Sequence, residues 1–152
     1  MAGTGTTGTR PALPDATNGE FLLQALREAN VHRAAHGAPP LAMDPLLVEY
    51  AKARAAALSR HEGLRAGHEG LRPGTGESVF WSQDEEMRGA ADAVASWYDD
   101  RDERDERDER DRLLRPACTA MGAARVSGQG PKACETYIVF VYEPLGDDPP
   151  PA

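Results

Sequence analysis

The chain has 152 residues, 40% of them hydrophobic and 28% charged, which is the length and composition of one ordinary globular domain. Its 17 basic and 25 acidic residues give a formal net charge of −8, so it offers no basic surface of the kind that binds nucleic acid. No run of residues is long and apolar enough to span a membrane, and two cysteines are too few for a disulfide framework.

Both ends of the sequence lack an apolar pattern. We expect residues 1–16 to form a flexible leader and residues 147–152 a disordered tail. The leader contains no apolar segment of the secretory type, so the chain as written is that of a cytoplasmic protein. In that compartment Cys118 and Cys134 are expected to be free thiols.

Two helices are predicted in the first part of the chain. Thr17 and Glu20 have capping-box spacing, so the first helix is expected to begin near Thr17 and to end at Gly37. Asp44 as N-cap and Pro45 at the first helical position mark the start of the second helix. The inner face predicted for this second helix consists of Leu46, Leu47, Tyr50, Ala51, Arg54 and Leu58.

A third helix is predicted to begin at Ser82, which has capping-box spacing to Glu85. Its buried stripe would consist of Met87, Ala90, Ala91, Val94, Trp97 and Tyr98. Residues 101–112, which follow it, repeat the triplet Arg-Asp-Glu and contain no apolar residue. We expect this low-complexity insert to be a solvated helical extension or a disordered loop, with an electrostatic docking surface as the alternative.

The last part of the chain is predicted to be β-structure. Residues 137–142 form a continuous apolar, β-branched and aromatic run that Pro144 closes, which is typical of a central strand covered on both faces. Residues 122–126 are a plausible partner strand, with residues 127–131 as the connection. Helices followed by strands predict an α+β fold, in which a sheet carries helices on both faces.

Four stretches carry a family resemblance: residues 29–46, Gly76-Glu77-Ser78 ahead of Trp81, residues 95–100, and residues 139–146. In this order they resemble the CAP superfamily, which comprises cysteine-rich secretory proteins, antigen 5 and pathogenesis-related 1 proteins and is also called the SCP domain. The sequence is most similar to bacterial, actinomycete-like members that lack the disulfides of the family. The resemblance covers about residues 19–146, and we assign the domain to residues 17–146.

The resemblance implies a three-layer α-β-α sandwich around a central, mainly antiparallel sheet, with a cleft that holds two histidines and two acidic residues. Family members bind divalent metal in this cleft, and several bind sterols or other lipids. By position, His68 matches the first histidine and Glu77 the glutamate of a Gly-Glu-Asn motif, whose asparagine is replaced by Ser78. Asp100 matches the second acid, one methylene shorter. The second histidine has no counterpart, because all four histidines precede residue 70.

The remaining set of His68, Glu77 and Asp100 offers one imidazole and two carboxylates. An oxygen-rich set of this kind suits a hard or weakly bound cation better than a structural zinc. The alternative is that His68 and Glu77 only form a structural hydrogen bond. A metalloprotease motif is absent, since Arg65 stands where His-Glu-x-x-His needs its second histidine.

The expected function is therefore that of a non-catalytic CAP domain with a degenerate metal cleft. It would act as a monomeric module for a lipid, a small molecule or a protein partner, with at most a weakly bound Zn²⁺ or Ca²⁺. One alternative is a metal-dependent, protease-like hydrolase that uses His68, Glu77 and Asp100. The other is a decayed member that folds without the ancestral activity. Because the family is mostly extracellular, the resemblance leaves the compartment open.

Overall fold

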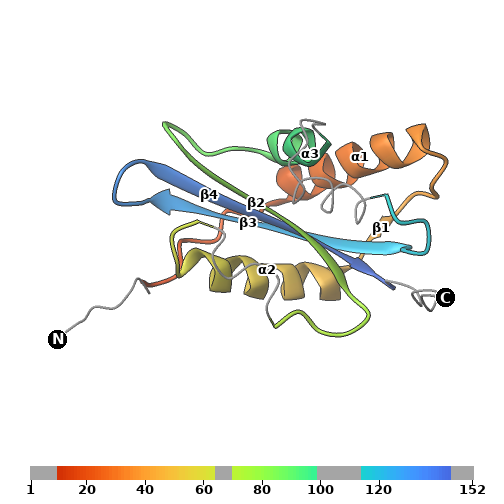
Figure 1. Cartoon of the computed structure of the whole chain (residues 1–152), viewed down its shortest axis with the longest axis horizontal. Helices are drawn as coiled ribbons and strands as arrows, with labels where there is room; N and C mark the ends of the chain where they lie inside the picture. Colours follow the sequence, from red (N-terminus) through yellow and green to blue (C-terminus); the bar gives the residue numbers. More distant parts are fainter. Residues whose placement is uncertain (1–9, 64–69, 99–113, 145–152) are drawn as a thin grey trace, which may run out of the picture.

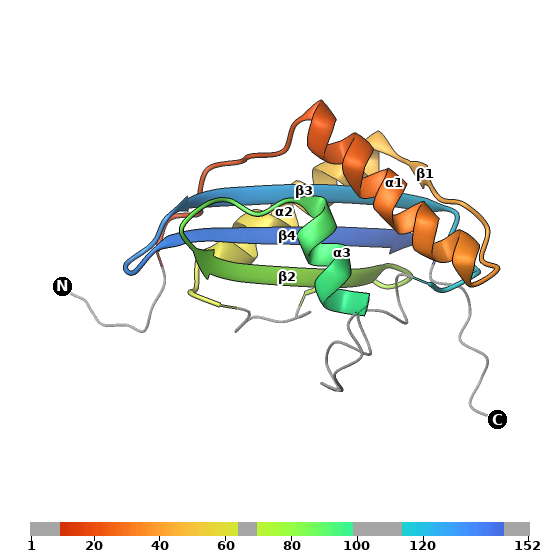
Figure 2. The same ribbon diagram turned by 90° about the horizontal axis from the view of Figure 1, so that it is seen from above.

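A computed structural model of the chain describes its residues 10–63, 70–98 and 114–144. They form three layers, with a four-stranded sheet in the middle (Figure 1). Helix α2 (Pro45–Ser59) covers one face of the sheet. Helices α1 (Gly19–Ala35) and α3 (Ala90–Tyr98) cover the other face (Figure 2). The predicted α-β-α sandwich is thus confirmed.

The sheet is mainly antiparallel, as predicted. Strand β4 (Cys134–Glu143) lies between β3 (Ala120–Gln129) and β2 (Gly76–Asp84) and runs antiparallel to both. The short strand β1 (Ala42–Met43) pairs with the outer edge of β3 in parallel orientation. The strand order is therefore β1-β3-β4-β2, with the most apolar strand inside.

The run at residues 137–142 lies in β4 and is fully buried, because each face of the strand meets a helical layer. One core lies on the α2 side and the other on the α1 and α3 side. The alternating side chains are Tyr137, Val139 and Val141 in the first core and Ile138, Phe140 and Tyr142 in the second. In the second core the rings of Phe140 and Trp97 meet edge to face, with their centroids 4.9 Å apart.

Helix α1 is capped by Asn18 and not by Thr17, so the predicted N-cap is wrong by one residue. The Oδ1 atom of Asn18 accepts a hydrogen bond from the backbone N–H of Phe21 at 2.8 Å. The hydroxyl of Thr17 is engaged elsewhere: it accepts from the backbone N–H of Arg125 at 2.9 Å. Bonding to β3 thus takes the Thr17 side chain away from the helix end. At the other end Gly37 has a φ of 76°, in line with the predicted stop.

The start of helix α2 is as predicted, with Pro45 first and the Asp44 carboxylate accepting from the N–H of Leu46 at 2.8 Å. The predicted inner face is wrong at Leu46, which is 78% exposed, because its neighbours Leu47 and Val48 turn toward the sheet in its place. The helix packs most closely against β3 at Gly122. A Cβ atom on Gly122 would lie 2.2 Å from the carbonyl carbon of Leu47.

The third predicted helix is wrong at its start. Ser82 belongs to β2, which pairs with β4 over nine residues from Gly76 to Asp84, and the helix begins at Ala90. Met87, expected in the buried stripe, precedes the helix and is 45% exposed. The pairing of a whole strand outweighs one local capping pattern, because it satisfies a backbone hydrogen bond at every second residue of the edge strand.

The chain before α1 differs from the expected flexible leader over residues 10–16, which we call the N-terminal strap. Asp15 forms an antiparallel bridge with Val126, and the N–H of Ser127 bonds to the carbonyl of Pro14 at 3.0 Å. The strap therefore continues the edge of β3 beyond β1. Residues 1–9, the insert at 101–112 and the tail at 147–152 lie outside the described residues.

Within the described parts of the chain, no helix combines the length and the apolar composition that crossing a membrane requires. Cys118 and Cys134 are free. They lie at opposite ends of the β3–β4 hairpin, since Cys118 precedes β3 and Cys134 pairs with Gln129 at its far end. About ten strand residues, or roughly 30 Å, separate them, which is far beyond the reach of a disulfide.

Candidate functional site

The structure describes one of the three predicted cleft residues. Glu77 lies on β2 and faces α2, in the same alternation as Val79 and Trp81, which belong to the core on the α2 side. His68 and Asp100 lie outside the described residues. Ser78, which replaces the asparagine of the family motif, points to the opposite face, where its hydroxyl accepts from Tyr142 at 3.1 Å.

The Glu77 carboxylate is buried and is held by Arg54 of α2. The Nε atom of Arg54 donates to Oε2 of Glu77 at 2.6 Å, and Nη2 donates to Oε1 at 2.7 Å. The Glu77 side chain is 0% exposed and that of Arg54 is 11% exposed. This is a bidentate pair of guanidinium and carboxylate, the strongest geometry available to these two groups.

The pair fixes the charge state of Arg54. The hydrogen bond that Arg54 donates to Glu77 raises the pKa of Arg54 and outweighs burial, which lowers it. The guanidinium therefore stays cationic and neutralises the buried carboxylate. Removing either partner alone would leave an uncompensated charge in the interior, which costs far more than losing an exposed ion pair.

The described residues alone do not assemble a divalent-cation site around Glu77. In residues 10–63, 70–98 and 114–144, no three His, Cys, Asp or Glu side chains come together in a metal-binding group. Both oxygens of Glu77 accept from Arg54 at short distances, so one lone pair on each oxygen is already bonded to a protein cation. Arg54 also places a positive charge where a cation would have to approach.

The role of Arg54 is the part of this site that the sequence analysis missed. Arg54 was placed on the inner face of the second helix, but it was not recognised as the partner of Glu77. An arginine among the alanines of such a face predicts an acidic partner on the sheet, because a guanidinium is almost never buried alone. Which acid it meets depends on how α2 lies across β2.

A second buried carboxylate on the α2 side belongs to Glu135 of β4. It is the centre of what we call the Glu135 cluster, with Arg10, Trp81 and Tyr137. Arg10 of the N-terminal strap donates from Nη2 to Oε1 of Glu135 at 2.6 Å and from Nη1 to Oε2 at 3.2 Å. The indole N–H of Trp81 and the hydroxyl of Tyr137 reach the same Oε1 at 3.4 and 3.3 Å. Glu135 is 0% exposed.

The charge states in the Glu135 cluster follow from these contacts. The hydrogen bond from Arg10 lowers the pKa of Glu135, so the carboxylate is ionised at neutral pH. Burial raises the pKa of Tyr137 to about 12, so its hydroxyl stays protonated and donates to the carbonyl of His61 at 2.7 Å. The cluster therefore fastens the strap and the end of α2 to the sheet.

The comparisons with known proteins agree with this architecture. The sequence profile of CAP, the cysteine-rich secretory protein family, matches residues 26–142. The chain belongs to the CAP family. The match includes Arg54 and Glu77, and it runs from within α1 almost to the end of β4. No curated protein matches the CAP chain described here.

Solved structures share the fold of this CAP domain at low sequence identity. A crystal structure of NaASP2 with Zn²⁺ is 16% identical with a TM-score of 0.63, covering 93% of this chain and 84% of NaASP2. A crystal structure of MpPR-1i is also 16% identical, with a TM-score of 0.56, covering 84% of this chain and 93% of MpPR-1i. A cysteine-rich secretory protein from Staphylococcus aureus is 18% identical with a TM-score of 0.51, covering 85% of this chain and 40% of that protein.

Proposed function

We propose that this chain is a non-catalytic CAP domain that acts as a ligand-binding or interaction module, with a cleft that has lost most of its affinity for divalent cations. The observation that carries the proposal is the bidentate pair of Arg54 and Glu77. The one family acid in the described residues already has its charge balanced by a protein cation. The chain also has no histidine after residue 70, where the family places its second one.

The proposal separates this chain from a metal-dependent hydrolase by a physical criterion. A catalytic zinc needs three protein ligands and an open position for water. His68, Glu77 and Asp100 reach that number only if Glu77 leaves Arg54. Without Glu77, the buried guanidinium of Arg54 would have no counterion, and the zinc ion would place a second positive charge beside it. We therefore expect weak or no binding of Zn²⁺ at neutral pH.

Zinc is the appropriate test cation, since NaASP2 shares the fold and its crystal structure includes Zn²⁺. The protein is dialysed against a mild chelator, its zinc content is measured, and Zn²⁺ is titrated calorimetrically. Arg54→Met should bind Zn²⁺ about tenfold more tightly than the wild type, because it releases both Glu77 oxygens and removes a positive charge. Lys52→Met, at a partly exposed position on the same helix, is the matched control and should not change zinc binding.

The result that would overturn the proposal is one zinc ion per wild-type chain that survives dialysis and is lost in His68→Ala and Glu77→Gln. That outcome would favour the hydrolase alternative, and peptide hydrolysis by the zinc-loaded protein would then be measured. Circular dichroism of each variant keeps the test independent of folding, because a variant that binds no zinc but has lost its helices says nothing about ligands.

A further inference from the structure

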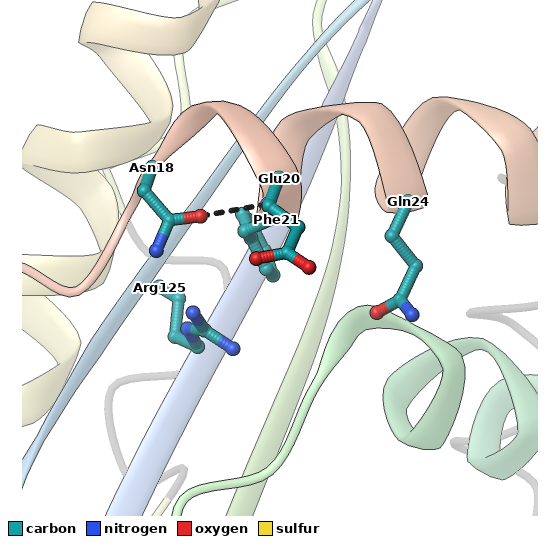
Figure 3. A pocket seen from close by; sticks show the side chains of 5 residues that line it. All are labelled: Asn18, Glu20, Phe21, Gln24 and Arg125. Atoms are coloured by element: carbon teal, nitrogen blue, oxygen red, sulfur yellow. Dashed lines mark hydrogen bonds between the residues drawn. The ribbon is translucent and has the colours of Figure 1, made fainter.

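A small polar pocket lies on the face of the sheet opposite Glu77, between the start of α1 and strand β3. It has a volume of about 170 Å³ and is lined by Asn18, Glu20, Phe21, Gln24 and Arg125. Figure 3 shows the side chains of Asn18, Glu20 and Gln24 on the same side of α1, with Asn18 and Glu20 near Arg125 of β3 and Gln24 directed to the start of α3. The pocket shares no residue with the pair of Arg54 and Glu77 or with the Glu135 cluster.

Arg125 is the unusual member of this pocket. The residue is 8% exposed, and its guanidinium is held by backbone carbonyls: Nε donates to Ala16 at 3.1 Å and Nη1 to Arg88 at 3.1 Å. The ring of Phe21 covers one face of the guanidinium, with the Cζ atom 4.7 Å from the ring centroid. Among the described residues, Nη2 has no hydrogen-bond partner. A nearly buried cation thus presents an unused donor to the pocket.

Glu20 is the acidic residue whose charge acts on Arg125, yet the two side chains do not form an ion pair. Glu20 raises the pKa of Arg125 by charge attraction alone, and burial, the larger effect, lowers it. Glu20 lies in the first turn of α1 and its side chain is exposed. The pocket therefore holds two opposite charges with a space between them. A simple anion would be repelled by Glu20, and a simple cation by Arg125.

The amide groups of the pocket also have donors to spare. The Oδ1 atom of Asn18 accepts from Phe21, and the Oε1 atom of Gln24 accepts from the backbone N–H of Ala90 at 3.1 Å. These bonds orient both side chains and leave their NH₂ groups for other partners. A volume of about 170 Å³ has room for several water-sized groups. It is therefore large enough for a compact α-amino acid.

We propose that this pocket binds a small zwitterion of the α-amino-acid class, with its carboxylate on Arg125 and its ammonium group on Glu20. The Asn18 and Gln24 amides donate further hydrogen bonds to the carboxylate, and the Phe21 ring lines the wall beside it. An α-amino acid carries both charges at neutral pH, on two groups bonded to the same carbon atom. Binding here does not depend on the state of the Glu77 cleft, so this proposal and the proposed function can fail separately.

The test uses L-alanine, acetate and ethylamine as probes of the ¹⁵N-labelled full chain by NMR at pH 7, without added metal. L-alanine is expected to shift the Gln24 side-chain NH₂ and the Arg125 Nε–H resonances in a saturable way. Acetate and ethylamine each lack one of the two charges, so they should bind at least about tenfold more weakly. No saturable shift of these resonances with L-alanine would overturn the proposal, and so would equal binding of acetate and L-alanine.

Variants assign the binding to the two charges. Glu20→Gln, at an exposed position, should weaken L-alanine about tenfold and leave acetate binding unchanged or tighter. Glu28→Gln lies on the same helix outside the pocket and is the matched control. Arg125→Lys keeps the positive charge but loses the paired N–H donors of the guanidinium, so it should weaken the binding of both L-alanine and acetate. If Arg125→Lys does not fold, Glu20→Gln still decides: unchanged affinity for L-alanine in that variant would overturn the proposal.

Discussion

The attachment of the N-terminal strap to the Glu135 cluster predicts that one side chain near the start of the chain has a large effect on stability. In Arg10→Met the buried Glu135 loses its two guanidinium donors, at 2.6 and 3.2 Å. Only the long contacts of Trp81 and Tyr137 remain, at 3.4 and 3.3 Å. A carboxylate that is 0% exposed is then left without a countercharge.

The size of the effect follows from burial. Breaking a fully buried ion pair costs about 3–5 kcal/mol, while an exposed pair contributes about 0–1 kcal/mol. Arg10 is 21% exposed, so some water reaches the pair. The indole N–H of Trp81 also remains as a weaker donor to Glu135. We therefore expect Arg10→Met to lower the free energy of unfolding by about 2 kcal/mol at pH 7, which is roughly 4–8 °C in melting temperature for a domain of this size.

The pH dependence distinguishes charge loss from lost packing. Arg10 lowers the pKa of Glu135 in the folded state, so this carboxylate stabilises the wild type above its unfolded pKa of about 4.3. The stabilisation is lost as the pH falls through the lower folded pKa. The difference between wild type and Arg10→Met should thus be largest near pH 7 and shrink below about pH 4.

Urea unfolding at several pH values between 7 and 3.5, followed by circular dichroism, measures both quantities. Lys52→Met is the control, because Lys52 pairs with Glu49 at the surface, where the Glu49 side chain is 70% exposed. It should melt within about 1–2 °C of the wild type. If Arg10→Met were as stable as the wild type at pH 7, the reasoning would be refuted. If its loss in the free energy of unfolding did not change with pH, the effect would be due to packing and not to charge.

Two further outcomes follow from the core. Gly122→Ala should destabilise the domain by about 1–3 kcal/mol in urea unfolding, because its Cβ would lie 2.2 Å from the Leu47 backbone. Gly19→Ala is the control and should not destabilise it, because the space around Gly19 is open. Equal unfolding midpoints for the two variants would contradict the close packing of α2 on β3. In an absorbance titration at 295 nm, Tyr137 should ionise only near pH 12, and Tyr137→Phe should reduce the absorbance change in that range by one tyrosine. Since the folded pKa is raised, the stabilisation from Tyr137 is present below pH 10 and lost as the pH rises toward 12; an absorbance change in that range that stays the same in Tyr137→Phe would contradict the assignment.

Elements whose signals are local and consistent could be predicted from the sequence. Asp44 and Pro45 mark the start of α2 because a cap and a fixed φ act within one helical turn. The run at residues 137–142 predicts β4 because six consecutive apolar, β-branched and aromatic side chains need cover on both faces. The family motif likewise singles out Glu77, whose carboxylate is buried and paired with Arg54.

Other features depend on contacts that no local pattern encodes. Ser82 carries a helix cap in sequence, yet it lies in β2, because the pairing with β4 extends over the whole strand. Arg10 appeared to belong to a flexible leader, although its partner Glu135 is 125 residues away. Such a contact forms only after the sheet has brought both ends of the chain together.

The composition and short patterns of this chain therefore determine its class, its central strand and its second helix, and the family motif singles out Glu77 as an acid of interest. What surrounds that acid is decided by the packed fold. Arg54 meets Glu77 only because α2 crosses the sheet at Gly122, where the absence of a side chain lets the helix approach. A carboxylate in a sequence can serve a metal or a guanidinium, and the one that comes within hydrogen-bonding distance is set by the geometry of the layers.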